Sequence, residues 1–388
     1  MDTTADGTPD AAHQGQRGRQ ERRGRQGQRD SERGDDREDE RGRDAAAGAS
    51  SRRAPGPYSG VGALDAAGIA VLACSAVWTL IAATGRAARP EGALLALLAV
   101  TAGFAAGRVL GAVLPVLAPA AAAVTVLALV LVPSSRLSGG SDSPPLGYAN
   151  ADAALLVLAV GGACCAAWAA RGPVVRTALW LTGAGAAATA LALGSTAGFA
   201  AGLAIVLCSL AAARMRGRLL GLVGLALATL LAVGGSYALA ENELPSGLSQ
   251  SLTGQLTQPR VDLWHQAVSL AEHHPLRGVG PERFPDDGSA VPDDAPSPIS
   301  AQSAPLQLAA EQGLPGAGLL GIAFGWLLCA LWRSPRPTPV VLTAGAGLTG
   351  LAMLASVDHV LGYAAVTAGA GFLAGIATAR PLADDLAP

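Results

Sequence analysis

Apolar segments long enough to cross a membrane recur along most of this chain, and they constrain its fold more strongly than any other feature. A membrane-spanning helix needs about 20 mostly apolar residues, because the hydrocarbon core of a bilayer is about 30 Å thick. We therefore expect an all-α, polytopic membrane helix bundle of about ten transmembrane helices. Their predicted ranges are 64–85, 90–107, 109–132, 153–170, 177–194, 196–213, 219–240, 314–332, 339–357 and 360–379.

The composition supports this interpretation because charged residues are scarce. Only 14% of the 388 residues are charged and 51% are hydrophobic, whereas a soluble domain carries about 25% charged residues. Many of the charges lie in residues 1–58, where large apolar side chains are rare. Such a segment buries too little surface to offset its loss of entropy on ordering, so it is predicted to be a disordered cytoplasmic tail.

Every basic residue is an arginine, and the positions of the arginines predict the orientation in the membrane. Short cytoplasmic connections of membrane proteins carry an excess of basic residues. If residues 1–58 are cytoplasmic, the arginine-rich connections also fall inside, and Arg86 and Arg89 after the first helix are the exceptions. We therefore predict a multi-pass protein of the cell membrane with both termini cytoplasmic. The arginines assigned to the inside are Arg108, Arg171, Arg176, Arg214, Arg216, Arg218, Arg333, Arg336 and Arg380.

This topology sends one long loop to the outer face of the membrane. The loop comprises residues 241–312. Connections as long as this are uncommon and are often functional. The loop also contains most of the side chains that are capable of chemistry, so it is the predicted functional region. The predicted segments are a tail at 1–58, helices one to seven at 59–240, an extracytoplasmic loop at 241–312, helices eight to ten at 313–380 and a cytoplasmic tail at 381–388.

The sequence argues against several other kinds of site. The five cysteines all lie in apolar segments without a CxxC spacing, so neither a disulfide framework nor a metal site is expected. No phosphate-binding GKS/T loop occurs, and we expect no cofactor. The twelve arginines of residues 1–55 are matched by twelve acidic residues, which argues against nucleic acid as a partner.

Two stretches of the loop, 258–284 and 300–321, carry a distinctive pattern of charged, aromatic and glycine residues. They read QPRVDLWHQAVSLAEHHPLRGVGPERF and SAQSAPLQLAAEQGLPGAGLLG. Arg260 and Trp264 are four residues apart, so they share one face of a helix predicted at 258–273. A guanidinium binds a diphosphate through paired hydrogen bonds, and a tryptophan is suited to the membrane interface.

The turn that follows this helix adds further cationic groups. Pro275 biases His274 away from helical conformation, and the glycines after it permit backbone geometries that other residues resist. Arg277 and Arg283 are expected to join Arg260 in a cationic patch that attracts an anionic lipid carrier. The histidines of the patch are His265, His273 and His274. The alternative is a loop that only rests on anionic membrane lipid.

Together the two stretches resemble the O-antigen ligase and polymerase superfamily, integral membrane glycosyltransferases that act on polyprenyl-diphosphate-linked glycans. The pattern is matched by Arg260, Trp264, His274, Pro275, Gly278, Val279, Gly280, Pro281 and Phe284, and then by Leu306, Gln307, Glu311, Gly313, Leu314 and Gly316. The resemblance implies a metal-independent glycan ligase or polymerase of cell-envelope polysaccharide assembly. The residues that we predict to bind the substrate are Arg260, Trp264, His274, Arg277 and Arg283.

The chain departs from the family pattern at two positions. Gln302 stands where the family has a histidine that is proposed to activate the acceptor hydroxyl, and Thr196 stands where it has an arginine. Glutamine can orient a hydroxyl group but cannot accept its proton. The predicted replacement bases are His359, which follows Asp358 at the outer end of the ninth helix, and then His265 in the loop.

These observations leave three functions open. The first is a glycosyltransferase that uses a polyprenyl-diphosphate-linked glycan. The second, favoured by Gln302 and Thr196, is a catalytically inactive relative that binds this carrier or serves as an assembly partner. The third is a transporter, which usually requires polar residues or interrupted helices within the bundle. The apolar helices of this chain argue against it.

Overall fold

The computed structural model describes residues 59–131, 148–215, 217–241, 258–284 and 301–380. Its contacts divide the chain into two units, Met1–Gly62 and Ala63–Pro388, and the second unit contains the helical bundle. The tails predicted at 1–58 and 381–388 lie outside the described residues.

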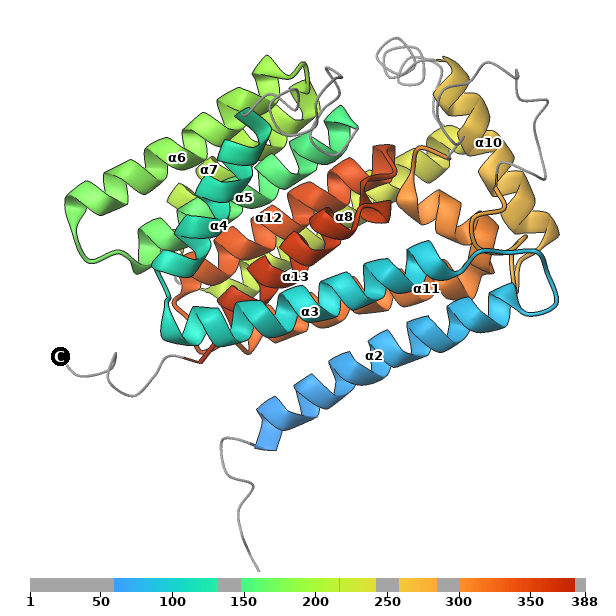
Figure 1. Cartoon of the computed structure of the whole chain (residues 1–388), viewed down its shortest axis with the longest axis horizontal. Helices are drawn as coiled ribbons and strands as arrows, with labels where there is room; N and C mark the ends of the chain where they lie inside the picture. The colour runs from blue at the N-terminus through green and yellow to red at the C-terminus, as the bar shows by residue number, and fades with distance from the viewer. Residues whose placement is uncertain (1–58, 132–147, 216, 242–257, 285–300, 381–388) are drawn as a thin grey trace, which may run out of the picture. The chain divides into compact units, whose positions relative to one another are not determined.

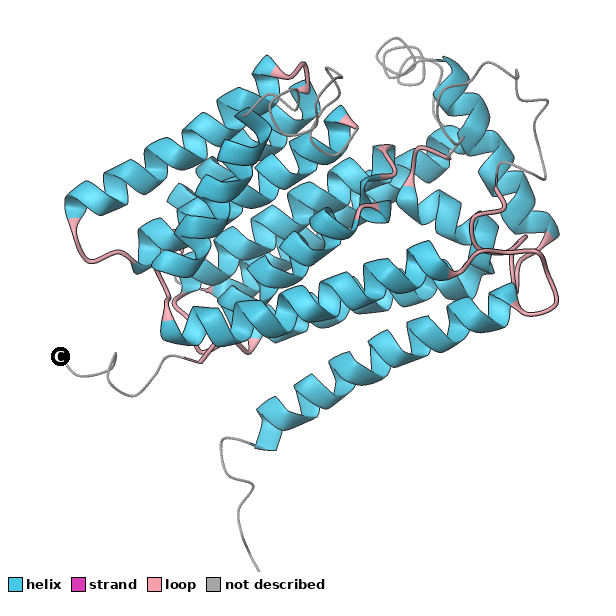
Figure 2. Cartoon of the chain, in the orientation of Figure 1, coloured by secondary structure: helices cyan, strands magenta, loops and turns pink. Residues whose placement is uncertain are grey.

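Helices make up the regular structure of the described residues, which contain no strand (Figure 2). They are α2 (Ser59–Ala83), α3 (Glu91–Val113), α4 (Leu117–Leu131), α5 (Ala149–Ala169), α6 (Pro173–Ala192), α7 (Thr196–Ala212), α8 (Arg218–Ala240), α10 (Gln258–His273), α11 (Ala304–Trp332), α12 (Thr338–Val357), the 3₁₀ turn η2 (Val360–Gly362) and α13 (Ala364–Thr378). Seven of them are long and apolar enough to cross a membrane, and α4, α7 and α13 are shorter apolar helices. The predicted all-α, polytopic membrane bundle is therefore confirmed.

One predicted helix boundary was wrong. A break was expected at Arg108, but α3 continues to Val113 and α4 begins only at Leu117. Arg108 forms an ion pair with Asp65 of α2, so its charge has a partner within the bundle. Pro115 lies between the two helices, where its missing N–H group cannot continue the hydrogen bonds of α3.

Glycine residues allow two helices of the bundle to approach closely. Figure 1 shows α3 (cyan) and α13 (red) running side by side. A Cβ atom at Gly103, Gly107, Gly371 or Gly375 would overlap the backbone of the other helix. Small residues of this kind permit backbone contact between helices in membranes. Close packing of α3 against α13 therefore brings the start of α3 next to the turn that precedes α13.

The connections between helices separate into two ends of the bundle, as alternating helices require. At one end, Arg86 after α2 donates a hydrogen bond to the carbonyl oxygen of Gly278 after α10 (2.6 Å). At the other end, Arg218 at the start of α8 donates to the carbonyl oxygen of Ser334 after α11 (2.6 Å). The first of these ends, which carries α10, is called the loop end below.

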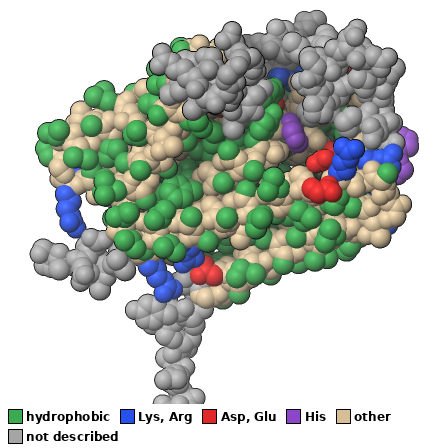
Figure 3. Space-filling view, viewed as in Figure 1, with side chains coloured by type: hydrophobic (Ala, Val, Ile, Leu, Met, Phe, Trp, Pro, Cys, Tyr) green, Lys and Arg blue, Asp and Glu red, His purple; other side chains and the backbone are tan. Residues whose placement is uncertain are grey.

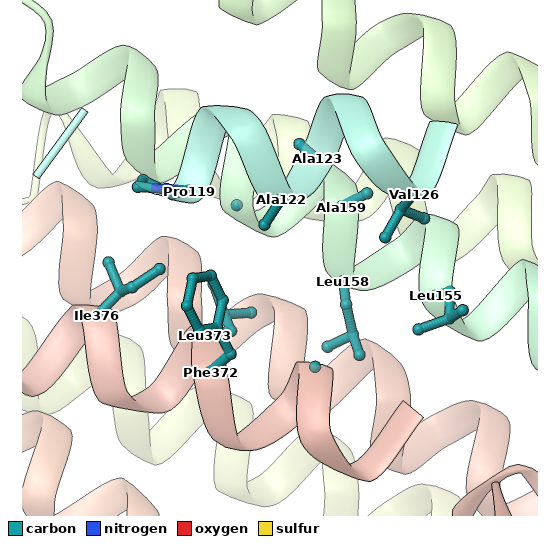
Figure 4. Close-up of a pocket in the computed structure, with 12 residues that line it drawn as sticks. Pro119, Ala122, Ala123, Val126, Leu155, Leu158, Ala159, Phe372, Leu373 and Ile376 are labelled. Atoms are coloured by element: carbon teal, nitrogen blue, oxygen red, sulfur yellow. The ribbon is translucent and has the colours of Figure 1, made fainter. Parts of the chain in front are cut away.

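A small cavity lies in the middle of the bundle between α4, α5 and α13. Its volume is about 50 Å³, and its lining includes Pro119, Leu158 and Phe372 but no charged side chain (Figure 4). A space of this size is far below the 300–1,000 Å³ typical of sites for small molecules. The cavity is therefore too small to be a substrate site.

Candidate functional site

A small apolar cluster fixes α10 onto the start of α11. Trp264 and Phe284 are both fully buried in it, together with alanine and leucine residues from α8, α10 and α11. The indole Nε1 of Trp264 donates a hydrogen bond to the carbonyl oxygen of Gln302 (3.4 Å). Trp264 is therefore a packing residue that positions α10, and it does not lie on an exposed interfacial surface.

Backbone hydrogen bonds join the two stretches that the sequence singled out. The N–H groups of Val279 and Gly280 donate to the carbonyl oxygens of Ala310 and Glu311, each at 2.9 Å. The N–H group of Leu314 donates back to the carbonyl oxygen of Pro275, also at 2.9 Å. The turn after α10 therefore forms one structural unit with α11, although the two are distant in sequence.

Two glycines make this backbone contact possible. Gly278 and Gly313 have φ angles of 58° and 72°, a left-handed conformation that other residues adopt at a cost. A Cβ atom on Gly278 would overlap the backbone of Glu311, and one on Gly313 would lie 2.6 Å from the carbonyl oxygen of Pro275. Both positions therefore require glycine for two independent reasons.

Gly313 also interrupts α11. Its φ of 72° and ψ of −175° are not helical, and Pro315 follows two residues later. The break separates a short half-helix, Ala304–Gln312, from the longer apolar part of α11. On the half-helix, Glu311 is 6% exposed. Its carboxylate accepts hydrogen bonds from the side-chain amide of Gln307 (2.9 Å) and from backbone N–H groups of the turn that ends at Phe284.

Arg260 and Gln302 are in direct contact at the start of the half-helix. The guanidinium Nε of Arg260 donates to the side-chain oxygen of Gln302 at 2.7 Å. Gln302 has a φ angle of 46°, a strained conformation for a residue with a side chain. Strained residues of this kind cluster at functional sites, where the surrounding structure holds them.

A second polar group lies in the turn between α12 and α13. Asp358 is 5% exposed, and its carboxylate accepts two hydrogen bonds from the hydroxyl of Tyr148 (2.8 and 2.9 Å). It also accepts from the side-chain amide of Asn150 and from the backbone N–H of His359 (2.6 Å). The ring of Tyr148 stacks on Tyr363 with centroids 5.8 Å apart.

The charge of Arg260 also acts on Tyr148. Burial and the Asp358 carboxylate raise the pKa of Tyr148 to about 12, and the positive charge of Arg260 acts in the opposite direction. Tyr148 therefore remains protonated and donates to the Asp358 carboxylate. Burial also lowers the pKa of His359, and its Nδ1 has no hydrogen-bond partner among the described residues. A neutral imidazole with a free nitrogen is able to accept a proton.

The arginines predicted to join Arg260 lie at the far end of the half-helix. Arg277 donates to the carbonyl oxygens of Ile81 and Thr84 at the end of α2, the latter at 2.9 Å. The half-helix and its flanking residues separate Arg277 from Gln302 by roughly 15 Å, at about 1.5 Å per residue. The arginines thus flank the half-helix instead of forming a single cluster.

Arg86 supports this second arginine group. It donates to the carbonyl oxygens of Arg277 (3.2 Å) and Gly278 (2.6 Å). A Cβ atom on Gly280 would lie 3.6 Å from the Cδ of Arg86 and 3.7 Å from the Cδ of Arg283, so both side chains pass beside this glycine. The group therefore contains three arginines from two separate connections.

His265, His274 and Thr196, which the sequence analysis singled out, take no part in the hydrogen bonds described so far. His265 is exposed in the middle of α10, and His274 is exposed directly after its last residue. Thr196 is exposed at the start of α7. Charged and histidine side chains nevertheless gather beside α10 in the space-filling view, and mainly apolar surface separates them from charges at the opposite end (Figure 3).

Sequence reasoning missed Tyr148, Asn150 and Arg86. The position of Arg86 did carry a signal, because it violated the arginine pattern expected for an outer connection. Its hydrogen bonds to Arg277 and Gly278 now account for that exception. Tyr148 and Asn150 flank the start of a helix and carried no signal in the sequence.

Residues 178–321 match the family described as O-antigen ligase. This segment is therefore similar to the O-antigen ligase family. The match runs from α6 into α11, so it includes α10, both motif stretches and the break at Gly313. The family resemblance inferred from the sequence is thus confirmed. No curated protein matches the chain.

Part of the site lies outside the segment that matches the O-antigen ligase family. Arg260, Gln302 and Arg277 belong to the matched segment, whereas Tyr148 and the Asp358–His359 pair do not. The tertiary structure brings Tyr148 and Asp358 to the loop end, next to the matched segment. Within the described residues, no group of three or more His, Cys, Asp or Glu side chains has the arrangement of a metal site.

Proposed function

We propose that this membrane protein binds a polyprenyl-diphosphate-linked oligosaccharide at the loop end and transfers the glycan to an acceptor hydroxyl during assembly of a cell-envelope polysaccharide. The observation that carries the proposal is the contact of Arg260 with Gln302 next to Tyr148 and Asp358. A guanidinium suited to phosphate thus lies beside groups suited to sugar hydroxyls. The match to the O-antigen ligase family supports the same substrate class.

In the proposed reaction, the acceptor oxygen forms a bond to the anomeric carbon of the donor glycan. The bond between that carbon and the diphosphate oxygen breaks, and polyprenyl diphosphate leaves with the bonding electrons. Arg260 stabilises the negative charge on the leaving group, and Arg277 and Arg283 extend the cationic surface along the half-helix. His274, at the exposed end of α10, belongs to the same proposed binding surface.

The acceptor proton requires a base, and His359 is the best candidate at the loop end. Burial lowers its pKa, so the imidazole is neutral at pH 7, and its Nδ1 is free among the described residues. Gln302 orients the acceptor hydroxyl in this scheme but cannot take its proton. His265 is exposed on α10 and is the second candidate.

The proposal is tested with purified protein in lipid nanodiscs. The assay supplies a polyprenyl-diphosphate oligosaccharide and a panel of acceptor glycans, and it measures released polyprenyl diphosphate. We expect Arg260→Ala to lower the release on the order of 100-fold, as loss of one stabilising group does in other enzymes. Arg214→Ala is the matched control, because Arg214 is exposed at the opposite end of the bundle. Transfer that is unaffected by Arg260→Ala would contradict the proposal.

A binding protein without catalytic activity is the second candidate. Gln302 supports it, because the side-chain oxygen of this residue already accepts a hydrogen bond from Arg260 and cannot act as a base. This function predicts that the carrier binds with a dependence on Arg260 but is never cleaved. Gln302→His separates the two candidates: a variant that gains transfer activity from an inactive parent identifies the natural chain as a binding protein.

We also propose that both termini are cytoplasmic, so that the loop end faces outward. The distribution of arginines supports this orientation. Fusion of alkaline phosphatase at a position in the loop is expected to give an active reporter, because the enzyme requires export. An inactive loop fusion together with an active C-terminal fusion would reverse the orientation.

A further inference from the structure

Two tryptophans tie α2 to α11 at separate points. The indole Nε1 of Trp326 donates to the carbonyl oxygen of Leu64 near the start of α2 (2.8 Å). The indole Nε1 of Trp78 donates to the carbonyl oxygen of Gln312, where the half-helix ends (2.9 Å). The helices are therefore antiparallel and joined at both ends of the shared segment. Figure 1 shows α2 (blue) at the edge of the bundle, alongside α3 and α11.

Between the two tryptophan contacts the helices enclose an open groove. Its volume is about 610 Å³, within the 300–1,000 Å³ typical of ligand sites. Small residues such as Ala73, Cys74 and Gly318 line it and leave the space unfilled. The complete lining is Ala73, Cys74, Val77, Trp78, Pro315, Gly318, Leu319 and Ile322, without a charged side chain.

One end of the groove lies next to the half-helix at the loop end. Trp78 lines the groove and binds Gln312, and the hydroxyl of Thr79 donates to the side-chain oxygen of Gln312 (3.3 Å). Thr84, six residues after Trp78, follows the last residue of α2. Its carbonyl oxygen accepts a hydrogen bond from the guanidinium of Arg277. The Nε of Arg277 has no hydrogen-bond partner among the described residues. An apolar groove thus ends at a cationic group.

We propose that this groove holds the isoprenoid chain of the donor, at the part next to the diphosphate. The inference rests on the proposed function, because it assigns a place to the tail of the same substrate. An isoprenoid diphosphate matches the site in both respects, because the groove accepts the apolar chain and Arg277 at its end attracts the anionic head. The chain leaves the groove beside Arg277, and the diphosphate lies at Arg260 and Gln302, as in the proposed reaction.

The groove is tested with a glycine substitution that fills it. A Cβ atom at Gly318 would meet no protein atom within 4 Å, and the same is true of Gly321 and Gly325 on the same helix. Gly318→Leu therefore adds a side chain to the groove lining where its Cβ has free space, whereas Gly321→Leu and Gly325→Leu add the same side chain outside the groove lining. All three variants gain similarly in helix propensity, so the two controls match the test variant.

The readout is the dissociation constant of decaprenyl monophosphate in nanodiscs, which requires no turnover. We expect Gly318→Leu to weaken binding about tenfold because it excludes part of the chain from apolar surface, and we expect both controls to bind like the parent. Equal binding by all three variants would overturn the groove proposal. If Gly318→Leu weakens binding of an ordinary phosphatidylglycerol equally, the groove is a general lipid site and the proposal is also wrong.

Cysteine labelling gives a second readout that separates this proposal from the proposed function. Cys74 lines the groove, whereas Cys208 and Cys329 are exposed on other parts of the bundle. Decaprenyl monophosphate is expected to slow maleimide labelling of Cys74 but not of Cys208. Protection of Cys74 without any glycan transfer would leave the groove valid and reject the transferase. Glycan transfer without protection of Cys74 would support the transferase and reject the groove proposal.

Discussion

The guanidinium of Arg260 donates a hydrogen bond to the side-chain oxygen of Gln302 at 2.7 Å. The bond joins the first turn of α10 to the segment just before α11, which begins after Ser303. Gln302 is one of the two positions where the sequence departs from the ligase pattern, and Arg260 is the residue expected to hold the diphosphate. The substitution of glutamine for histidine therefore changes the immediate partner of the phosphate ligand as well as the candidate base.

This contact predicts that Arg260 and Gln302 are energetically coupled. Arg260→Ala and Gln302→Ala are each expected to lower the melting temperature, and the double variant should lose less than the sum of the two. The expected coupling is about 1 kcal/mol, typical of a partly buried hydrogen bond to a charged group. Thermal unfolding of the four proteins in one detergent measures it. Strict additivity would show that the two side chains do not interact in solution.

The backbone contact between the motif stretches predicts that Gly278 and Gly313 do not tolerate alanine. Each substitution forces a residue with a side chain into a left-handed conformation and against a neighbouring backbone. We expect a loss of about 1–3 kcal/mol from backbone strain alone, seen as a lower melting temperature. Gly321→Ala is the control, because its Cβ meets no atom within 4 Å. Similar melting of all three variants would refute the close contact.

Arg86 is predicted to hold the turn after α10. Arg86→Ala removes the hydrogen bonds to the carbonyl oxygens of Arg277 and Gly278 and should cost about 1 kcal/mol. Faster hydrogen exchange of the peptide that contains Gly278 is the specific signature. Arg89→Ala is the matched control, because Arg89 is exposed and contacts Pro281 only through its backbone N–H (3.2 Å). Equal exchange in the two variants would exclude this role of Arg86.

Tyr148 is predicted to stabilise the buried Asp358 carboxylate. Tyr148→Phe keeps the stacked ring but removes both hydrogen bonds from the hydroxyl, and it should cost about 1–3 kcal/mol. Because the pKa of Tyr148 is raised to about 12, the hydroxyl is a donor at any physiological pH. Tyr363→Phe serves as the control, since it preserves the stack without touching this bond. Loss of stability in Tyr363→Phe but not in Tyr148→Phe would contradict the assignment.

His359 is predicted to make stability depend on pH in the weakly acidic range. Burial lowers its pKa from the model-compound value of 6.5, although the Asp358 charge opposes the shift. The unfolded chain then binds the proton more readily, so the contribution of His359 is complete above pH 6.5 and is lost as pH falls through the folded-state pKa. His359→Gln should melt with a weaker dependence on pH below 6.5 than the parent. Parallel profiles would show that His359 does not titrate in this range.

Most of the fold followed from the sequence, because a helix in a bilayer must be long, apolar and internally hydrogen-bonded. These requirements are local and leave a direct pattern in the chain, so the all-α membrane bundle and the family resemblance of the loop were predicted correctly. The break predicted at Arg108 was wrong because α3 continues through this charged residue. A charged residue indicates a connection only when it has no partner, and Arg108 has Asp65.

Tertiary packing decided which residues share the site. Arg260 meets Gln302 because α10 docks on the start of α11 through Trp264, and no spacing in the sequence encodes that contact. Arg277 was expected beside Arg260, but the half-helix holds the two apart. Tyr148, the residue just before α5, donates a hydrogen bond to Asp358 in the turn between α12 and α13. Helix periodicity determines on which face of its own helix a residue lies. Which faces of different helices touch depends on the packing of whole helices, and a local stretch of sequence does not contain that information.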